Sequence, residues 1–215
     1  MNIVLLGATG FVGSALLKEA LQRGHWVTAI SRSASKLDAH PNLTPVEVDI
    51  NDVATLTSLF VDRDAVIHAY APPKSESIAR RIEQQTYATQ TIITALKHAG
   101  VKRILAVGGA GTLKVAGGGY NMDRPDFPRE YEGGVKSTKV VKELLEQEPG
   151  LEWTSLSPAH EIFSGERTGK FRLGLDDMIV DNAGISRISV EDFAVAMIDE
   201  LETPQHTHRR FTVGY

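Results

Sequence analysis

The sequence predicts an α/β fold, a doubly wound parallel sheet with helices on both faces, and three observations lead to this prediction. Apolar runs typical of strands alternate with amphipathic helical stretches from the start of the chain to residue 157. The first run, Asn2–Leu6, passes directly through a glycine-rich turn into a helical pattern. The chain has 215 residues, 42% hydrophobic and 23% charged, which suits a single domain over residues 1–215 with a sizeable core.

The glycine-rich turn is the most informative stretch of the chain. Gly7, Gly10 and Gly13 follow the spacing G-x-x-G-x-x-G between the first strand and the first helix. Gly7 permits the tight turn, Gly10 lets the backbone approach a phosphate, and Gly13 lets the helix pack closely on the strand. The free N–H groups of the helix N-terminus then face a pyrophosphate. This context predicts a Rossmann-like fold with a bound dinucleotide; the alternative is a glycine-rich turn without a ligand.

The residues after the second strand distinguish between the two nicotinamide dinucleotides. We expect the first helix to end at Gly24 and the second strand to cover Trp26–Ile30, which Ser31, Arg32 and Ser33 follow. An acid at this position binds the ribose 2′-hydroxyl of NAD, whereas an arginine accommodates a 2′-phosphate. Arg32 offers a bidentate phosphate contact, and the serine hydroxyls add donors. We therefore predict NADP(H) in preference to NAD(H); the alternative is an arginine that is merely exposed.

An acid follows the third predicted strand, Leu43–Val48, in which Pro45 indicates an irregular edge. Asp49 occupies a position that commonly faces the adenine amino group in this fold class. The alternative is that Asp49 or Asn51 caps the helix that begins near Asp52.

His68 leaves the carboxyl end of the fourth predicted strand, Asp64–Ile67. Ligands of open parallel sheets bind beyond the carboxyl ends of the strands, so we expect this loop to contact the cofactor through its backbone. The imidazole stays unassigned, because a satisfied loop histidine is an equal alternative. A long helix over Ser75–His98, capped at Gly100, comes next. Its apolar stripe either packs on the sheet or pairs with a second copy in a homodimer.

A long glycine-rich segment follows the fifth predicted strand, Lys102–Val107. Residues 108–129, called the flap segment below, include three consecutive glycines at 117–119. Loops of this length in a compact domain are usually functional or disordered. Because the segment leaves the carboxyl edge of the sheet, we expect a flexible flap near the nicotinamide. A helix over Arg129–Gln147 and a sixth strand over Trp153–Leu156 follow.

The remainder of the chain is predicted to form a small cap on the substrate side over residues 158–189, called the cap segment below. We expect a short strand around residues 165–172, a helix ending at Leu201, and a last strand over Arg209–Val213.

Composition restricts the partners and the compartment. The formal net charge is −4 and the chain has no cysteine, so nucleic acid, an anionic membrane, disulfides and thiolate chemistry are not expected. The first residues already form a strand and a turn rather than a signal peptide, and no apolar run reaches membrane-spanning length. We expect a cytoplasmic protein whose partner is a small-molecule acceptor.

With these features placed, the chain resembles the atypical short-chain dehydrogenase/reductases, and within them the NmrA-like NAD(P)H-binding family and its NADH-flavin reductase group. The motifs that carry the resemblance are 7–13, Arg32, Asp49, 108–111, 126–128, 157–159, 165–169, 186–189 and 210–215. The resemblance spans essentially the whole chain.

The resemblance implies a set of cofactor-binding residues. It places Gly7, Thr9, Gly10, Phe11 and Val12 on the pyrophosphate, Arg32 on the 2′-phosphate, Asp49 and Ile50 at adenine, His68, Ala69 and Tyr70 along the ribose, and Gly108, Gly109 and Pro158 at the nicotinamide. Together with Ser33, these are the candidate site residues; no catalytic residue is assigned.

The catalytic pair of the wider superfamily is missing. Carbonyl reduction there uses Tyr-x-x-x-Lys, in which the ammonium lowers the pKa of the phenol. Tyr131 has Val135 at i+4, and the nearest lysine, Lys136, lies about 140° round the helix from Tyr131 instead of about 40°. Gly109 or Thr112 replaces the usual serine. A proton-relay ketone reductase, epimerase or dehydratase is therefore disfavoured.

Hydride transfer to a flavin or quinone-like acceptor needs positioning rather than a proton relay. We therefore predict an NADPH-dependent oxidoreductase, a reductase of this type. One alternative is a non-catalytic protein that senses NADP(H) and regulates a partner, as NmrA-like relatives do. Another is a sugar-nucleotide epimerase, dehydratase or ketone reductase that takes its acid from Tyr120, Tyr131 or His160.

Two cations of the cap segment have open roles. Arg167 and Lys170 either bind an anionic group, such as the phosphate of a flavin substrate, or form loop ion pairs with Glu166 or Asp176.

Overall fold

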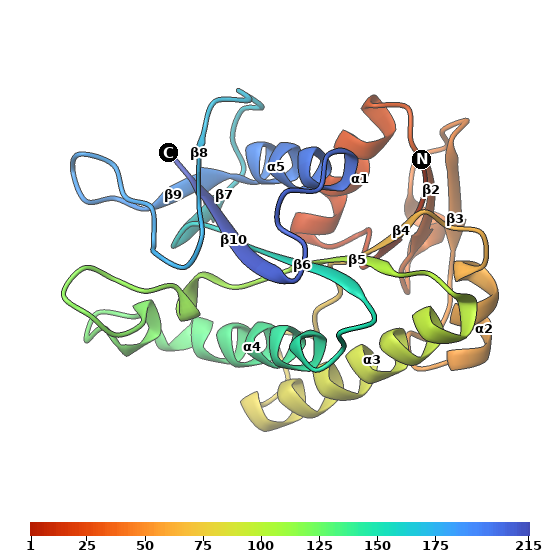
Figure 1. The fold of residues 1–215 in the computed structure, drawn as a ribbon, viewed down its shortest axis with the longest axis horizontal. Helices are drawn as coiled ribbons and strands as arrows, with labels where there is room; N and C mark the ends of the chain where they lie inside the picture. The colour runs from red at the N-terminus through yellow and green to blue at the C-terminus, as the bar shows by residue number, and fades with distance from the viewer.

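The computed structural model describes residues 1–215 and consists of an eight-stranded sheet with helices on both faces (Figure 1). The strand order is β3-β2-β1-β4-β5-β6-β10-β8, and every neighbouring pair is parallel except β10 with β8. The strands of this sheet are β1 (Asn2–Leu6), β2 (Trp26–Ile30), β3 (Leu43–Val46), β4 (Ala65–His68), β5 (Arg103–Val107), β6 (Glu152–Ser157), β8 (Arg172–Gly174) and β10 (Arg209–Gly214). Two further strands, β7 (Glu161–Phe163) and β9 (Arg187–Ser189), form a small parallel sheet.

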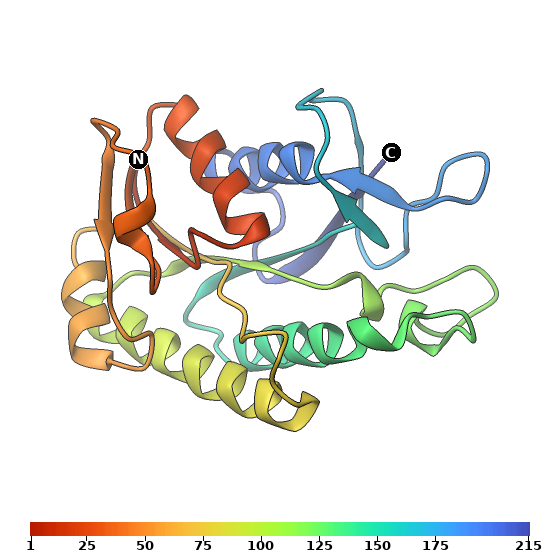
Figure 2. The same cartoon turned by 180° about the vertical axis from the view of Figure 1, so that it is seen from behind.

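The helices divide between the two faces, as both views of the ribbon show (Figures 1 and 2). One face carries α1 (Phe11–Gln22) and α5 (Val190–Glu202), and the other carries α2 (Val53–Phe60), α3 (Ile78–Ala99) and α4 (Glu132–Glu146). Short 3₁₀ turns lie at η1 (Ala34–Lys36), η2 (Ala110–Thr112), η3 (Asn121–Asp123) and η4 (Arg129–Tyr131). The predicted doubly wound, Rossmann-like fold is confirmed. No helix has the length and apolar character needed to cross a membrane.

The first strand explains why the fold needs a continuous apolar run. Ile3 and Leu5 belong to the core cluster under α1 and α5, whereas Val4 and Leu6 belong to the cluster under α2, α3 and α4. Successive side chains of a strand point to opposite faces, so a strand that is covered on both faces is apolar throughout. The sheet therefore presents only its edges and strand ends to solvent.

Several predicted boundaries are wrong by a few residues. The third strand ends at Val46, and Pro45 does lie on an edge strand. Asp52 is the N-cap of α2 and accepts a hydrogen bond from the Thr55 amide, so neither predicted alternative cap is used. The fourth strand runs one residue further and includes His68.

The ends of the helices follow their capping residues. The long helix α3 begins after its N-cap Ser77 and ends at Gly100, in the left-handed conformation predicted for a C-terminal glycine. The predicted helix from Arg129 begins with the 3₁₀ turn η4, and the α-helix proper starts at Glu132.

The cap segment is built from β7, β8 and β9 rather than from one short strand. The strand predicted around residues 165–172 is present only from Arg172, where β8 pairs antiparallel with β10. Residues 165–171 are irregular, because the Asp192 carboxylate at the start of α5 accepts hydrogen bonds from the amides of Thr168 and Gly169, each at 2.8 Å.

Candidate functional site

Backbone contacts impose glycine at two positions of the turn after β1. Gly7 has φ +82°, and a Cβ there would lie 2.6 Å from the Ala69 carbonyl oxygen. A Cβ on Gly13 would lie only 2.0 Å from the Gly7 carbonyl oxygen. The close contact of Gly13 is therefore with the backbone of the turn, at Gly7, rather than with the strand as predicted. Ala69, expected at the ribose, lies against this turn.

The N-terminus of α1 is open for an anion. Gly10 is its N-cap and supplies no side chain, and the first amide with a helical acceptor is that of Ser14, 2.8 Å from the Gly10 oxygen. The amides of Phe11, Val12 and Gly13 have no protein acceptor. Unpaired donors and the positive end of the helix dipole favour a phosphate here.

A group of hydroxyls lies beside Arg32 at the carboxyl end of β2. Thr9 Oγ1 is 2.5 Å from Ser31 Oγ, and the Ser33 hydroxyl donates to Thr9 Oγ1 at 3.3 Å. The guanidinium of Arg32 is exposed and forms no ion pair or hydrogen bond. The structure thus brings the predicted residues Thr9, Arg32 and Ser33 together and leaves the cation available.

The predicted adenine and ribose residues extend this group along the sheet edge. Asp49 is exposed, and its carboxylate accepts the Asn51 amide at 3.0 Å. Ile50 and Tyr70 pack against the core cluster under α2 and α3. Burial raises the pKa of Tyr70, the charge of Arg32 opposes this rise, and that of Asp49 adds to it. The charges of Arg32 and Asp49 therefore both act on the Tyr70 hydroxyl.

His68 has its imidazole in the interior. Its Nε2 lies 3.3 Å from Thr89 Oγ1 and 3.3 Å from Gln85 Nε2 on α3, and its Nδ1 has no partner. Burial lowers the pKa of His68 to about 4, so the ring is neutral at physiological pH. The side chain is part of the core, which leaves only the backbone of this position for a cofactor, as expected.

The predicted nicotinamide residues lie at the carboxyl ends of β5 and β6. A Cβ on Gly108 would lie 2.9 Å from the hydroxyl oxygens of Ser155 and Ser157, and one on Gly109 would lie 2.3 Å from Thr138 Oγ1. Pro158 is buried directly after β6. Because β1 to β6 are parallel, all fifteen candidate residues gather at one edge of the sheet.

The α4 face at this edge carries no Tyr–Lys pair. Val135 and Thr138 of α4 are the side chains nearest to a Cβ built on Gly111 and Gly109, respectively. Tyr131 precedes α4, where its side chain is half-exposed.

The flap segment is fastened to the rest of the protein, which sequence reasoning missed. Asn121 is fully buried; its Nδ2 donates to the Ala110 carbonyl at 3.3 Å and lies 2.9 Å from His160 Nδ1. Arg210 on β10 donates to the Thr112 carbonyl at 2.9 Å. The predicted flexible flap is therefore attached to the protein through these contacts, and its longest exposed run is residues 116–120, which includes the three glycines. These partners are remote in sequence, so no local pattern announces them.

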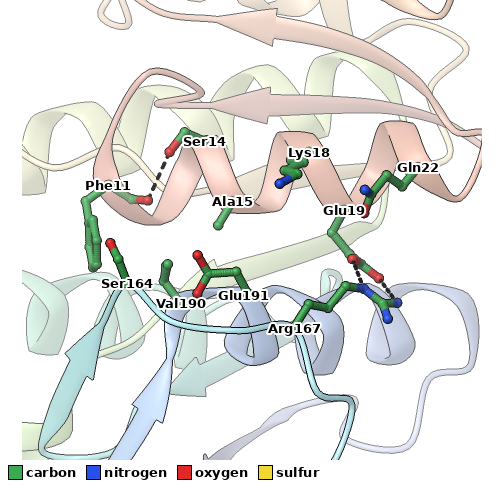
Figure 3. A pocket seen from close by; sticks show the side chains of 10 residues that line it. All are labelled: Phe11, Ser14, Ala15, Lys18, Glu19, Gln22, Ser164, Arg167, Val190 and Glu191. Atoms are coloured by element: carbon green, nitrogen blue, oxygen red, sulfur yellow. Dashed lines mark hydrogen bonds and ion pairs between the residues drawn. The ribbon is translucent and has the colours of Figure 1, made fainter.

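A cavity of about 380 Å³ lies along α1, between this helix on one side and the cap segment with the start of α5 on the other (Figure 3). Phe11 and Ser164 lie at one end and Arg167 at the other. Arg167 donates to both carboxylate oxygens of Glu19, at 2.7 and 2.8 Å. Neither acid expected to pair with Arg167 does so, and Asp176 pairs with Arg210 instead.

The fold defines a protein of the Rossmann class. The glycine turn, the open helix N-terminus and the unpaired arginine at one edge of its sheet define it as a dinucleotide-binding protein. Residues 7–201 match the model of the NAD(P)H-binding family. The chain belongs to this oxidoreductase-like family, and it is an atypical short-chain dehydrogenase/reductase-like protein.

Relatives of the same length share the fold throughout. A protein of Bacillus subtilis named YwnB is 40% identical over 99% of this chain and 98% of its own. A solved structure from Bacteroides thetaiotaomicron, assigned as an epimerase, is 45% identical, with a TM-score of 0.89 and coverage of 100% of this chain and 96% of its own. One from Streptococcus pneumoniae, assigned as an NADH-flavin reductase, is 31% identical, with a TM-score of 0.85 and coverage of 100% and 99%.

Proposed function

We propose that this protein is an NADPH-dependent oxidoreductase that passes a hydride to a flavin or quinone-like acceptor without a Tyr–Lys pair. The observation that carries the proposal is the α4 face beside the predicted nicotinamide position, where Val135 and Thr138 are the side chains that face Gly111 and Gly109. Neither side chain is an acid strong enough to protonate an alkoxide. The relative assigned as an NADH-flavin reductase supports the same acceptor class.

The preference for the phosphorylated cofactor rests on Arg32. Its guanidinium is unpaired, and the hydroxyls of Ser31 and Ser33 lie on either side of it in the sequence, both linked to Thr9. A bidentate guanidinium–phosphate contact is among the stronger polar contacts in proteins. The Asp49 carboxylate accepts a hydrogen bond from the Asn51 amide and forms no ion pair with Arg32.

The protein's share of the chemistry is positioning. When bound, the reduced nicotinamide supplies the hydride at its C4 atom. The amides at the start of α1 hold the diphosphate. Gly108 and Gly109 let the backbone after β5 lie close against Ser155, Ser157 and Thr138, at the edge where the nicotinamide is predicted. An acceptor ring stacked there needs contact and exclusion of water, and a reduced flavin takes its proton from solvent.

Stopped-flow loss of NADPH absorbance tests the proposal, with FMN, FAD, riboflavin and a panel of quinones as acceptors. We expect turnover above the uncatalysed rate with at least one flavin or quinone, and slower turnover when NADH replaces NADPH. No turnover above the uncatalysed rate with any of these acceptors would overturn it.

A second candidate function is a sensor of the NADPH/NADP⁺ ratio that regulates a partner protein. It is favoured by the contacts that residues 109–112, which follow β5, already make within the protein. Thr138 packs against Gly109, and Arg210 donates hydrogen bonds to the carbonyl and hydroxyl oxygens of Thr112. A sensor would bind NADPH and NADP⁺ with different affinities and show no turnover. Similar affinities together with measurable turnover would exclude it.

A further inference from the structure

One of the three buried arginines of this chain, Arg81, has no carboxylate partner, whereas the other two have one. Arg81, Arg103 and Arg210 are 8%, 7% and 8% exposed, respectively. Arg103 donates to the Glu200 carboxylate at 3.0 Å, and Arg210 donates to that of Asp176 at 3.0 Å. The guanidinium of Arg81 has no ion pair and no hydrogen bond, and its Nε is buried without a partner.

A pair of glycines makes the space in which this guanidinium lies. Arg81 is in the first turn of α3, and a Cβ on Gly133, in the first turn of α4, would lie 2.5 Å from its Nη1. A Cβ on Gly134 would lie 3.7 Å from its Nη2. The guanidinium therefore lies against a stretch of α4 without side chains, between the first turns of two helices.

This cation lies just outside the edge that carries the nicotinamide residues. Gln85, one helical turn further along α3, contacts His68 at the end of β4. Val135, directly after the glycine pair, contacts the position of Gly111 after β5. The guanidinium is thus about one helical turn, ~5 Å along the helix axis, beyond the contacts that mark the carboxyl ends of β4 and β5.

We propose that Arg81 binds the anionic group, a phosphate or a carboxylate, of the hydride acceptor; this inference rests on the proposed function. Burying a charge without a partner is costly, and an oxyanion that accepts two N–H donors of a guanidinium removes that cost. The glycine pair contributes no side chain that could pair with the guanidinium, so its N–H donors are left for a ligand. For a flavin acceptor, the site selects FMN, which carries a phosphate, over riboflavin, which does not.

Quenching of flavin fluorescence measures this selectivity without turnover. NADP⁺-loaded protein is titrated with FMN and with riboflavin, for wild type, Arg81→Met and the control Arg80→Met, whose arginine is exposed and paired with Glu83. We expect wild type and the control to bind FMN at least ~10-fold more tightly than riboflavin, the worth of one charged hydrogen bond. Arg81→Met should bind the two flavins equally. Equal affinities in wild type, or an unchanged FMN preference in Arg81→Met, would overturn the proposal.

Two further measurements keep the outcomes separate. If Arg81→Met does not fold, Arg81→Lys keeps a charge without the planar fork, and its FMN preference should be smaller than that of wild type; an unchanged preference overturns the proposal. Sedimentation of wild type and variant tests whether a carboxylate of a second copy is the partner instead: dissociation of a dimer on substitution, with FMN preference intact, also overturns it.

Turnover of riboflavin and FMN at equal efficiency rejects the inference but retains the reductase function. FMN-selective binding without turnover with any acceptor rejects the reductase function and the acceptor role of the site, while leaving Arg81 as an anion site.

Discussion

The amino-terminal half of the cofactor site and the cap segment are held together in opposite ways. In the first, Gly7 meets Gly13, and Thr9 meets Ser33, within one short stretch of chain. In the second, Arg167 reaches Glu19 across 148 residues. The difference shows that this half of the cofactor site is built mainly by contacts between residues close in sequence, whereas the cap segment depends on polar contacts between residues far apart in sequence.

The largest effect is expected at the crowded glycine of the turn. In Gly13→Ala the new Cβ would lie 2.0 Å from the Gly7 carbonyl oxygen, so the turn and the helix must separate. We expect the free energy of unfolding to fall by at least ~3 kcal/mol and NADPH binding to be lost. Urea titration and binding calorimetry measure the two effects.

Gly24→Ala is the matched control, because Gly24 has φ +79° but nothing within 4 Å of a Cβ. It should lower the free energy of unfolding by only about 1–2 kcal/mol, the cost of a left-handed residue, and keep NADPH binding. An equal loss of binding in both variants would contradict the local account of the site.

The next effect is a dependence of stability on pH from His68. Burial lowers its pKa in the folded protein to about 4, below the ordinary 6.5 of the unfolded chain, so folding requires the neutral ring. The stability that the folded protein has with the neutral ring is fully present above pH 6.5 and is lost progressively as the pH falls toward 4. At about 1.4 kcal/mol per pH unit, the loss reaches about 3 kcal/mol at most.

His68→Gln removes this titration, and urea unfolding of both proteins between pH 4 and pH 7 measures it. The variant should lose less stability than wild type over this range. Parallel pH profiles would show that the imidazole is not buried as a neutral group.

A smaller effect is expected in the cap segment. Asp192 of α5 is fully buried, and its carboxylate, which holds the amides of the cap segment, also accepts a hydrogen bond from the Tyr215 hydroxyl at 2.8 Å. Asp192→Asn replaces one of its acceptor oxygens by an NH₂ donor that faces other donors. We expect the free energy of unfolding to fall by about 2 kcal/mol while the affinity for NADPH stays unchanged. Glu191→Gln, which alters one hydrogen bond to the Gly165 amide, is the control and should cost less than ~1 kcal/mol. A parallel loss of NADPH affinity in Asp192→Asn would mean that the cap segment shapes the cofactor site.

The parts of this protein that could be predicted are those with local causes. Asn2–Leu6 is apolar because both faces of β1 are covered, and the spacing of Gly7 and Gly13 follows from one backbone contact. The strand Trp26–Ile30 was predicted correctly, and its end fixes where Arg32 emerges, while the contact of Arg32 with a 2′-phosphate stays a prediction. The N-cap of α2 was misassigned because three neighbouring residues, Asp49, Asn51 and Asp52, are all suitable caps and only the helix start decides among them.

The parts that could not be predicted depend on remote partners. Nothing near Asn121 indicates that it meets His160, and nothing near residue 165 indicates that Asp192 will replace a strand with an irregular loop. The unpaired state of Arg81 is likewise invisible in the sequence, because it is a property of three-dimensional surroundings. Contacts of this kind determine the structure of the cap segment and of the residues around the predicted nicotinamide position, so the sequence alone predicts the function of these regions least well.

Titration calorimetry of wild type and Arg32→Asp with NADPH and NADH tests whether Arg32 selects the phosphorylated cofactor. We expect wild type to bind NADPH at least ~10-fold more tightly than NADH and the variant to lose or reverse this preference, since a carboxylate repels the 2′-phosphate and accepts the 2′-hydroxyl. No heat with either reduced or oxidised NADP, or equal affinities of wild type for NADPH and NADH, would contradict this expectation.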